Sequence, residues 1–193
     1  MRKGNVMDDR VVMVIDLDRC WGCKGCEVAC KEALELGVGS RPLRVVDIGP
    51  RSLDGTSQLQ RDSVPTMCQH CDEAACLATC PTGAIYRAGD GTVQIDAARC
   101  IACARCQEAC PFGAVDIMAG ERNCAVKCTL CRERRQNGQL PSCAQHCLGR
   151  AIKVVAEAEL ATLVGERYNW RTGRIVYVSD KWSGLGQGLN LVR

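Results

Sequence analysis

The spacing of the cysteines constrains this chain more than any other feature of its sequence. Seventeen of the 193 residues are cysteine, and sixteen of them fall into four groups of four. The first and third groups have the spacing C-x2-C-x2-C-x3-C, and the second has C-x2-C-x4-C-x3-C. The fourth has eleven residues in its middle gap. In chain order the groups are Cys20, Cys23, Cys26 and Cys30; Cys68, Cys71, Cys76 and Cys80; Cys100, Cys103, Cys106 and Cys110; and Cys128, Cys131, Cys143 and Cys147.

Cysteines at this density serve disulfides, zinc sites or iron–sulfur clusters. Disulfide frameworks are typical of short secreted chains, and structural zinc sites usually combine two close pairs of ligands. Three cysteines in a C-x2-C-x2-C loop instead wrap three corners of a 4Fe–4S cluster, while the fourth cysteine binds a neighbouring cluster. The spacing therefore indicates 4Fe–4S clusters, and a structural zinc protein is a much weaker alternative.

The composition agrees with bound clusters in the interior. Only seven residues are aromatic, so rings cannot dominate the core as they do in most globular enzymes. With 47% hydrophobic and 24% charged residues, the chain is also too apolar to be disordered. We expect cluster assembly to be coupled to folding. Each oxidised cluster with four thiolates carries a formal charge of about −2, so four clusters change the formal net charge of +3 to about −5.

The N-terminal residues bear on localisation. They carry neither a long apolar segment nor a small-residue cleavage site. The longest apolar run there, residues 11–15, is far shorter than a membrane span. We therefore expect a cytoplasmic protein without direct membrane insertion, in a compartment that keeps thiols reduced for metal binding. Export to the periplasm with a signal-bearing partner is the alternative.

A repeated segment at the end of three cysteine groups predicts local structure. Residues 80–85 (CPTGAI) are matched by 110–115 (CPFGAV) and, less closely, by 147–152 (CLGRAI). Each predicts a turn and then a short strand, and Gly89-Asp90-Gly91 predicts a hairpin. We also expect strands at 11–15, 45–48 and 174–179, a helix over 156–164 and a surface loop over 51–61. These elements predict an α+β fold that uses the pattern of a two-cluster bacterial ferredoxin twice.

With these four motifs, and with Gln69-His70 inside the second, the chain resembles the four-cluster iron–sulfur subunits of molybdenum or tungsten pterin oxidoreductases. This family includes electron-transfer subunits of dimethyl sulfoxide reductase, formate dehydrogenase, polysulfide reductase and aldehyde oxidoreductase. The likeness covers about residues 11–155. It implies two interleaved ferredoxin-like lobes with short hairpins and helices. We expect the first lobe to take residues 1–62 and 119–155, the second to take 63–118, and a partner-docking extension to take 156–193.

The resemblance also implies which cysteines share a cluster, since motif one pairs with motif four and motif two with motif three. The implied ligand sets are Cys20, Cys23, Cys26 and Cys147 for cluster one; Cys30, Cys128, Cys131 and Cys143 for cluster two; Cys68, Cys71, Cys76 and Cys110 for cluster three; and Cys80, Cys100, Cys103 and Cys106 for cluster four. Ala74-Ala75 and Leu148 stand where the family usually has proline. We expect these differences to alter loop geometry without removing a ligand.

Cys124 is the seventeenth cysteine and lies outside the four motifs. We interpret it as a buried free thiol that behaves as a small hydrophobic residue. A substitute ligand or a redox-active thiol is the alternative.

Four clusters in one small chain predict a wire that carries electrons between distant sites. The sequence shows no catalytic constellation, so we expect no enzymatic activity from this chain alone. His70 and His146 lie beside ligands, and we interpret them as hydrogen-bond donors or loop residues. The basic run 132–135 fits a surface of motif four better than a nucleic-acid site. Five cations beside the motifs either raise cluster potentials or are solvated: Lys24, Arg99, Arg105, Lys127 and Arg132.

We expect the chain to dock on a large catalytic subunit, such as an aldehyde oxidoreductase or formate dehydrogenase with a molybdenum or tungsten pterin. A further flavin, quinone or ferredoxin partner would exchange electrons at the other end. The alternatives are a free-standing polyferredoxin and a subunit of a hydrogenase or carbon monoxide dehydrogenase. Four aromatic residues near the C-terminus fit a partner interface or a cover over the chain's own lobes: Tyr168, Trp170, Tyr177 and Trp182.

Overall fold

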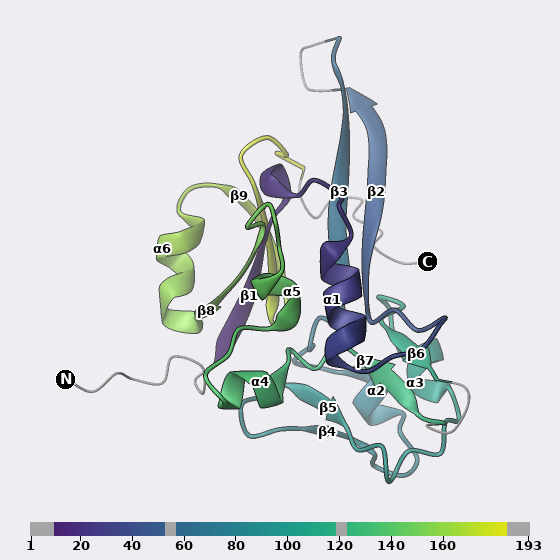
Figure 1. Ribbon diagram of the computed structural model, residues 1–193. Coiled ribbons are helices and arrows are strands. Elements are labelled where there is room, and N and C mark those ends of the chain that lie inside the picture. The colour runs from purple at the N-terminus through teal and green to yellow at the C-terminus, as the bar shows by residue number, and fades with distance from the viewer. Residues whose placement is uncertain (1–9, 53–56, 119–122, 185–193) are drawn as a thin grey trace, which may run out of the picture.

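The computed structural model describes residues 10–52, 57–118 and 123–184. These residues form ten strands and six short α-helices, so the α+β class predicted from the sequence is confirmed. Figure 1 shows a four-stranded sheet beside a projecting hairpin, with two smaller hairpins and small helices grouped at one end of them. The buried side chains gather in three clusters, which we call the main core, the small-hairpin core and the outer core.

The four-stranded sheet has the strand order β8-β1-β10-β9. β1 (Val11–Asp16) runs parallel to β10 (Ile175–Ser179) and antiparallel to β8 (Ile152–Ala156). β9 (Tyr168–Thr172) pairs antiparallel with the other side of β10. Every residue of β1 and β10 is buried, which explains why both segments are continuous apolar runs and not alternating patterns.

The two faces of β1 contribute to different cores. Met13 and Ile15 lie in the main core, whereas Val12 and Val14 lie in the outer core. The outer core is completed by α6 (Leu160–Val164), which covers this face of the sheet at the edge of the molecule in Figure 1. The helix predicted over 156–164 is therefore shorter than expected, because residues Glu157–Glu159 form a separate 3-10 turn, η2.

The C-terminal segment contributes two strands to this sheet. The strand predicted at 174–179 is confirmed as β10, which lies between β1 and β9. β9 was not predicted, because an edge strand with mostly exposed side chains lacks the alternation that marks a half-buried strand. Residues 168–179 therefore pack against the N-terminal strand of the same chain.

A long hairpin projects from the body of the molecule in Figure 1. It consists of β2 (Leu43–Ser52) and β3 (Leu59–Met67), which pair antiparallel with an irregularity between Ile48 and Arg51. The strand predicted at 45–48 is confirmed. The surface loop predicted over 51–61 is wrong at both ends, because polar side chains there form cross-strand contacts, such as Arg61 with Asp47 at 2.7 Å. Residues 53–56 lie outside the described residues.

Two short hairpins surround the small-hairpin core. β4 (Ile85–Arg87) pairs with β5 (Val93–Ile95), and β6 (Val115–Ile117) pairs with β7 (Ala125–Lys127). The predicted hairpin around Gly89-Asp90-Gly91 is confirmed. The strands predicted after the repeated turns are confirmed as β4, β6 and β8.

The remaining helices belong to the cysteine motifs and are short. They are η1 (Leu17–Arg19), α1 (Gly25–Ala33), α2 (Ala75–Ala78), α3 (Arg105–Ala109), α4 (Arg132–Gln136) and α5 (Ser142–Gln145). The residues that precede α1, α3 and α4 adopt left-handed backbone conformations, with φ of 58° at Lys24, 63° at Ala104 and 46° at Cys131. Each cysteine loop thus turns sharply before its helix begins.

Candidate metal centres

Two sets of four cysteines each line a cavity. Cys20, Cys23, Cys26 and Cys147 line one of them, together with apolar side chains from β2, β3 and β8. Cys80, Cys100, Cys103 and Cys106 line the other, together with residues of the small-hairpin core. Each cavity combines cysteines from two motifs, as the resemblance implies. Cys23 and Cys103 are exposed, so both cavities lie close to the molecular surface.

A third set of cysteines lies deeper in the chain. Burial raises the pKa of Cys143 well above its ordinary value, and the neighbouring Cys128 and Cys131 raise it further. Burial likewise raises the pKa of Cys30 to about 12, with Cys131 adding to the rise. These electrostatic couplings indicate that Cys30, Cys128, Cys131 and Cys143 lie near one another.

The fourth set shows the same mutual influence. Burial raises the pKa of Cys76 to about 11, with Cys68, Cys110 and Cys71 adding to the rise. Cys128 of the third set is also coupled to Cys68 of this one. The two deeper sets therefore adjoin each other.

The free thiols and their hydrogen bonds fit iron–sulfur ligation. All seventeen cysteines are free of disulfides. Backbone N–H groups donate to Sγ atoms of five predicted ligands: His70 to Cys68, Ala114 to Cys110, Ala125 to Cys100, Leu130 to Cys128 and Ala151 to Cys147, at 3.2–3.4 Å. Such donors stabilise negative charge on sulfur and raise the reduction potential of a ligated cluster.

The spacing of the thiols bears on whether they bind a single metal ion or a cluster. Among the described residues, no three His, Cys, Asp or Glu side chains converge closely enough to hold a single metal ion. A cubane separates its four thiolates more widely than one ion does, because each thiolate binds a different iron. The cysteines that line the two cavities fit a donor set of this kind.

Gly22 lets the first motif approach the projecting hairpin. Its backbone has φ of +68°, which L-residues rarely adopt, and a Cβ atom there would lie 2.4 Å from Ser63 Oγ. The loop that carries Cys20 and Cys23 thereby lies directly against β3.

The two histidines differ in their surroundings. His70 is fully buried, and its Nδ1 accepts a 3.1 Å hydrogen bond from the backbone N–H of Val93. Burial first, and then the nearby ammonium of Lys127, hold the pKa of His70 well below its ordinary value. The Nδ1 of His146 lies 2.9 Å from the carbonyl of Ser142, where the ring can donate.

The five candidate cations divide by exposure. Lys24, Arg99 and Arg105 are exposed, which fits the solvated alternative. Lys127 is only 2% exposed, so the solvated alternative is wrong for this residue. Its Nζ donates to the carbonyls of Val93 and Cys128.

Two residues of the basic run 132–135 contact a carboxylate of the same chain. Arg135 is 1% exposed and forms a 2.6 Å ion pair with Asp90, while Arg132 lies 3.7 Å from the same carboxylate. The predicted exposed basic face of motif four is therefore wrong for Arg135. The sequence predicts only a turn role for Asp90, because its partners lie more than 40 residues away.

The remaining predicted residues are placed as follows. Cys124 is buried, 9% exposed, immediately before β7, as expected for a small hydrophobic residue. Three of the four C-terminal rings pack on the main core: Trp170, Tyr177 and Trp182. Tyr168 is 47% exposed. No helix formed by the described residues has the length and apolar character needed to cross a bilayer.

Comparison with known proteins assigns the family. Residues 59–157 match the family described as the 4Fe-4S dicluster domain. The chain is 36% identical over 170 residues to the thiosulfate reductase electron transfer subunit PhsB of Salmonella typhi, covering 86% of this chain and 88% of that protein. It is 33% identical over 195 residues to the formate dehydrogenase iron-sulfur subunit of Wolinella succinogenes, covering 90% and 95%. It is 34% identical over 160 residues to one subunit of the anaerobic dimethyl sulfoxide reductase of Haemophilus influenzae, covering 78% and 76%.

The fold and the cysteine sets define an iron–sulfur protein. This protein belongs to the 4Fe–4S dicluster family. It carries 4Fe–4S clusters and serves in electron transfer as a non-catalytic subunit, in agreement with the expectation from its motifs.

Proposed function

We propose that this chain carries four 4Fe–4S clusters and connects the active site of a large molybdenum or tungsten pterin subunit to a second redox partner. The grouping of the sixteen cysteines into four sets supports this proposal most directly. The names of the relatives support the catalytic partner, since they are subunits of a thiosulfate reductase, a formate dehydrogenase and a dimethyl sulfoxide reductase.

The proposed ligands are those implied by the motifs. The two surface cavities would hold clusters one and four, and the two deeper sets would hold clusters two and three. Because the deeper sets adjoin at Cys128 and Cys68, we propose that electrons pass the sites in the order one–two–three–four. Exposed Cys23 and Cys103 would then mark the two ends of the wire.

The proposed lobes follow the same division. The small-hairpin core supports the second lobe, residues 63–118, whereas the main core joins the first lobe, residues 1–62 and 119–155, to Val64, Met67 and Cys68. Two boundaries need adjustment. Because β7 pairs with β6, residues 125–127 fit the second lobe, and because β3 pairs with β2, residues 63–67 fit the first. Of the extension 156–193, the strands β9 and β10 extend the sheet of the first lobe, and partner docking is proposed only for its exposed surface.

The chain's own residues hold the clusters and keep water away from them. Bound clusters supply one-electron storage at each site. The cysteine thiolates hold them, the backbone N–H donors stabilise added negative charge, and the apolar cores exclude water. We propose a cytoplasmic complex, with the periplasm as the alternative; fractionation of native cells distinguishes the two.

Purification of the native complex tests the proposal. We expect a large subunit to co-purify, with molybdenum or tungsten in that subunit and about sixteen irons and sulfides in this chain. Low-temperature electron paramagnetic resonance should show several interacting 4Fe–4S signals. A stable monomer without a large subunit would instead support a polyferredoxin, and nickel would point to a hydrogenase or carbon monoxide dehydrogenase. Zinc without iron would refute the cluster assignment.

A further inference from the structure

Two buried polar side chains meet where the inner ligand sets adjoin. Lys127 immediately precedes Cys128, and His70 immediately precedes Cys71. Lys127 is 2% exposed and His70 is fully buried. The two side chains therefore share one enclosed junction between the proposed second and third clusters.

The backbone of Val93, in β5, fixes both side chains. Its N–H donates to Nδ1 of His70 at 3.1 Å, and its carbonyl accepts from Nζ of Lys127. Lys127 also donates to the carbonyl of Cys128 at 3.0 Å. Among the described strands β5 pairs with β4, between the second and third motifs, so these contacts tie that hairpin to the start of motif four.

Both side chains retain an unused donor. Because Nδ1 of His70 accepts a hydrogen bond, the ring proton lies on Nε2, and Nε2 has no hydrogen-bond partner among the described residues. The ammonium of Lys127 has three N–H groups, two of which go to carbonyls. Among the described residues it forms no ion pair with a carboxylate. Buried donors of this kind are normally satisfied, so each is suited to an acceptor other than the polar atoms of the described residues.

The charges around the junction favour an anionic acceptor. Buried Arg135 and Arg174 lie near His70, and the nearby carboxylate of Asp90 is paired with Arg135. The ammonium of Lys127 also lies near Cys76, a proposed ligand of the third cluster. Sulfur atoms of ligated clusters are the acceptors that this position would face.

We propose that Lys127 and His70 form a shared polar junction that makes the two inner clusters easier to reduce than the two outer ones. This proposal rests on the function proposed above. Reduction adds negative charge, which a buried ammonium and an N–H donor stabilise, whereas the outer sites have mainly exposed cations beside them. The pair would act as positioning and charge-compensating residues and not as ligands.

The test is a redox titration of the complete protein, followed by electron paramagnetic resonance. In Lys127→Gln, which removes the charge, the reduced-to-oxidised ratio of the inner clusters at a fixed potential should fall at least tenfold, equivalent to about 59 mV for a one-electron couple. Lys127→Arg should keep the parent's ratio. His70→Asn removes the ring donor at a backbone φ of 49° that asparagine tolerates, and it should shift the ratio in the same direction as Lys127→Gln. Lys24→Gln, an exposed lysine beside Cys23, is the matched control and should leave the inner signals unchanged.

Several outcomes would overturn the proposal. The first is an unchanged reduced-to-oxidised ratio of the inner clusters in Lys127→Gln or His70→Asn, the two neutral variants, when the iron content is full. The second is an equal shift of that ratio in the Lys24→Gln control. Loss of iron from both neutral variants would also overturn it, because the pair would then be structural. Outer signals are assigned with Cys23→Ser and Cys103→Ser. If the parent itself lacks four clusters by iron and sulfide analysis, the proposed function fails, which is a separate result.

Discussion

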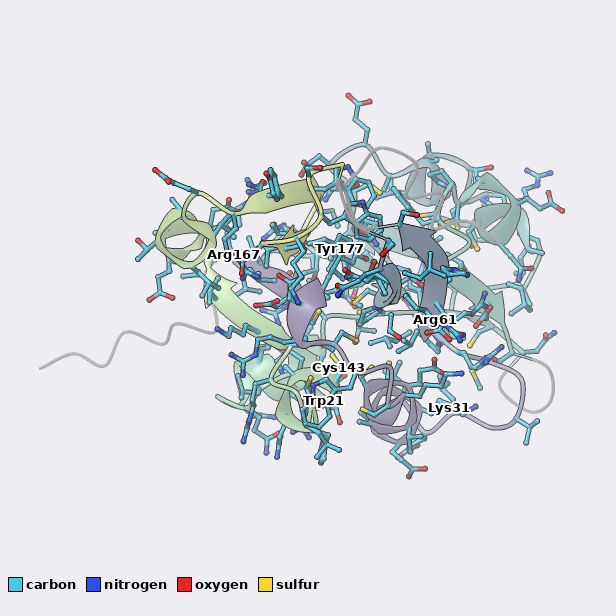
Figure 2. All side chains as sticks on the ribbon, turned by 90° about the horizontal axis from the view of Figure 1, so that it is seen from above. Trp21, Lys31, Arg61, Cys143, Arg167 and Tyr177 are labelled. Atoms are coloured by element: carbon cyan, nitrogen blue, oxygen red, sulfur yellow. The ribbon has the colours of Figure 1, made fainter. Side chains whose placement is uncertain are left out.

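Tyr177 shows how one side chain links the C-terminal sheet to the cluster-bearing core. It is fully buried in β10, and its hydroxyl donates to the carbonyl of Pro65 in β3 at 3.1 Å. Its ring stacks on Trp170, with centroids 5.5 Å apart. In Figure 2 Tyr177 lies among crowded side chains, whereas Trp21, 73% exposed, lies toward the rim. Burial raises the pKa of Tyr177 well above its ordinary value.

Replacing Tyr177 by Phe should therefore change stability in two ways. Near pH 8 the free energy of unfolding of the variant should be about 1–3 kcal/mol lower than that of the parent, because the buried carbonyl of Pro65 loses its donor. Above about pH 10 the unfolded parent releases the tyrosine proton but the folded parent does not, so the parent's stability falls as pH rises. Tyr177→Phe lacks this pH-dependent loss, so the difference in the free energy of unfolding between the two proteins should shrink as the pH rises. Urea unfolding from pH 8 to 11 measures this difference. Parallel profiles of unfolding free energy against pH for the two proteins would contradict the expectation.

Cys124 offers a second prediction at this scale. It is buried, and none of the four proposed ligand sets includes it. Cys124→Ser should keep about sixteen irons per chain, with a modest loss of stability from placing a hydroxyl in a buried site. Iron and sulfide analysis decides, and Cys128→Ser is the control that should lose iron. A drop in iron for Cys124→Ser would establish it as a substitute ligand.

Sequence predicts some residue roles far better than others. The sixteen candidate ligands stand out because each motif is local, with fixed spacing within about twenty residues. The burial of Lys127 and the ion pair of Arg135 with Asp90 could not be predicted. Both depend on the β4–β5 hairpin packing against motif four, which is a contact between segments distant in sequence.

At the scale of elements, β10 is one of the two central strands of the four-stranded sheet and not an appendage. Its residues alternate between the main core, which contains Ile175 and Tyr177, and the outer core, which contains Val176 and Val178. The apolar run predicted this strand correctly. Its parallel partner β1 lies about 160 residues earlier, and no local pattern encodes such a pairing.

Ile175→Ala should therefore destabilise the whole protein. The side chain is fully buried in the main core, and deleting it should cost about 2–5 kcal/mol. Tyr168→Ala, in the exposed edge strand β9, is the matched control and should cost much less. Thermal unfolding of the two holoproteins gives the comparison. Equal losses would mean that the C-terminal strands are not part of the cooperative core.

At the scale of the whole molecule, the clusters should be necessary for the fold. The chain has few aromatic residues, and many of its buried positions are ligand cysteines. Removing iron with a chelator under reducing conditions should abolish the near-ultraviolet circular dichroism and expose the thiols. Reconstitution with iron and sulfide should restore both. An apoprotein with native tertiary signals would show that the polypeptide folds without its clusters.

Cluster loading should also change the protein's charge. The sequence has a calculated isoelectric point of about 8.1, and its formal net charge of +3 counts the cysteines as neutral. Four oxidised clusters with their thiolates add about −8. The holoprotein should therefore focus at a clearly acidic pH under anaerobic native conditions, and the apoprotein should focus near the sequence value. Identical positions for the two forms would contradict this charge assignment.

The parallel pairing of β1 with β10 has a consequence for biosynthesis. At typical rates of 5–20 residues per second, a ribosome makes β10 about 8–32 s after β1. Until then β1 lacks a central neighbour, and Cys147, the proposed fourth ligand beside the first motif, is made only shortly before β10. The first cluster site therefore lacks its fourth proposed cysteine until residue 147 has been made, and we expect iron and sulfide to enter it only after that point.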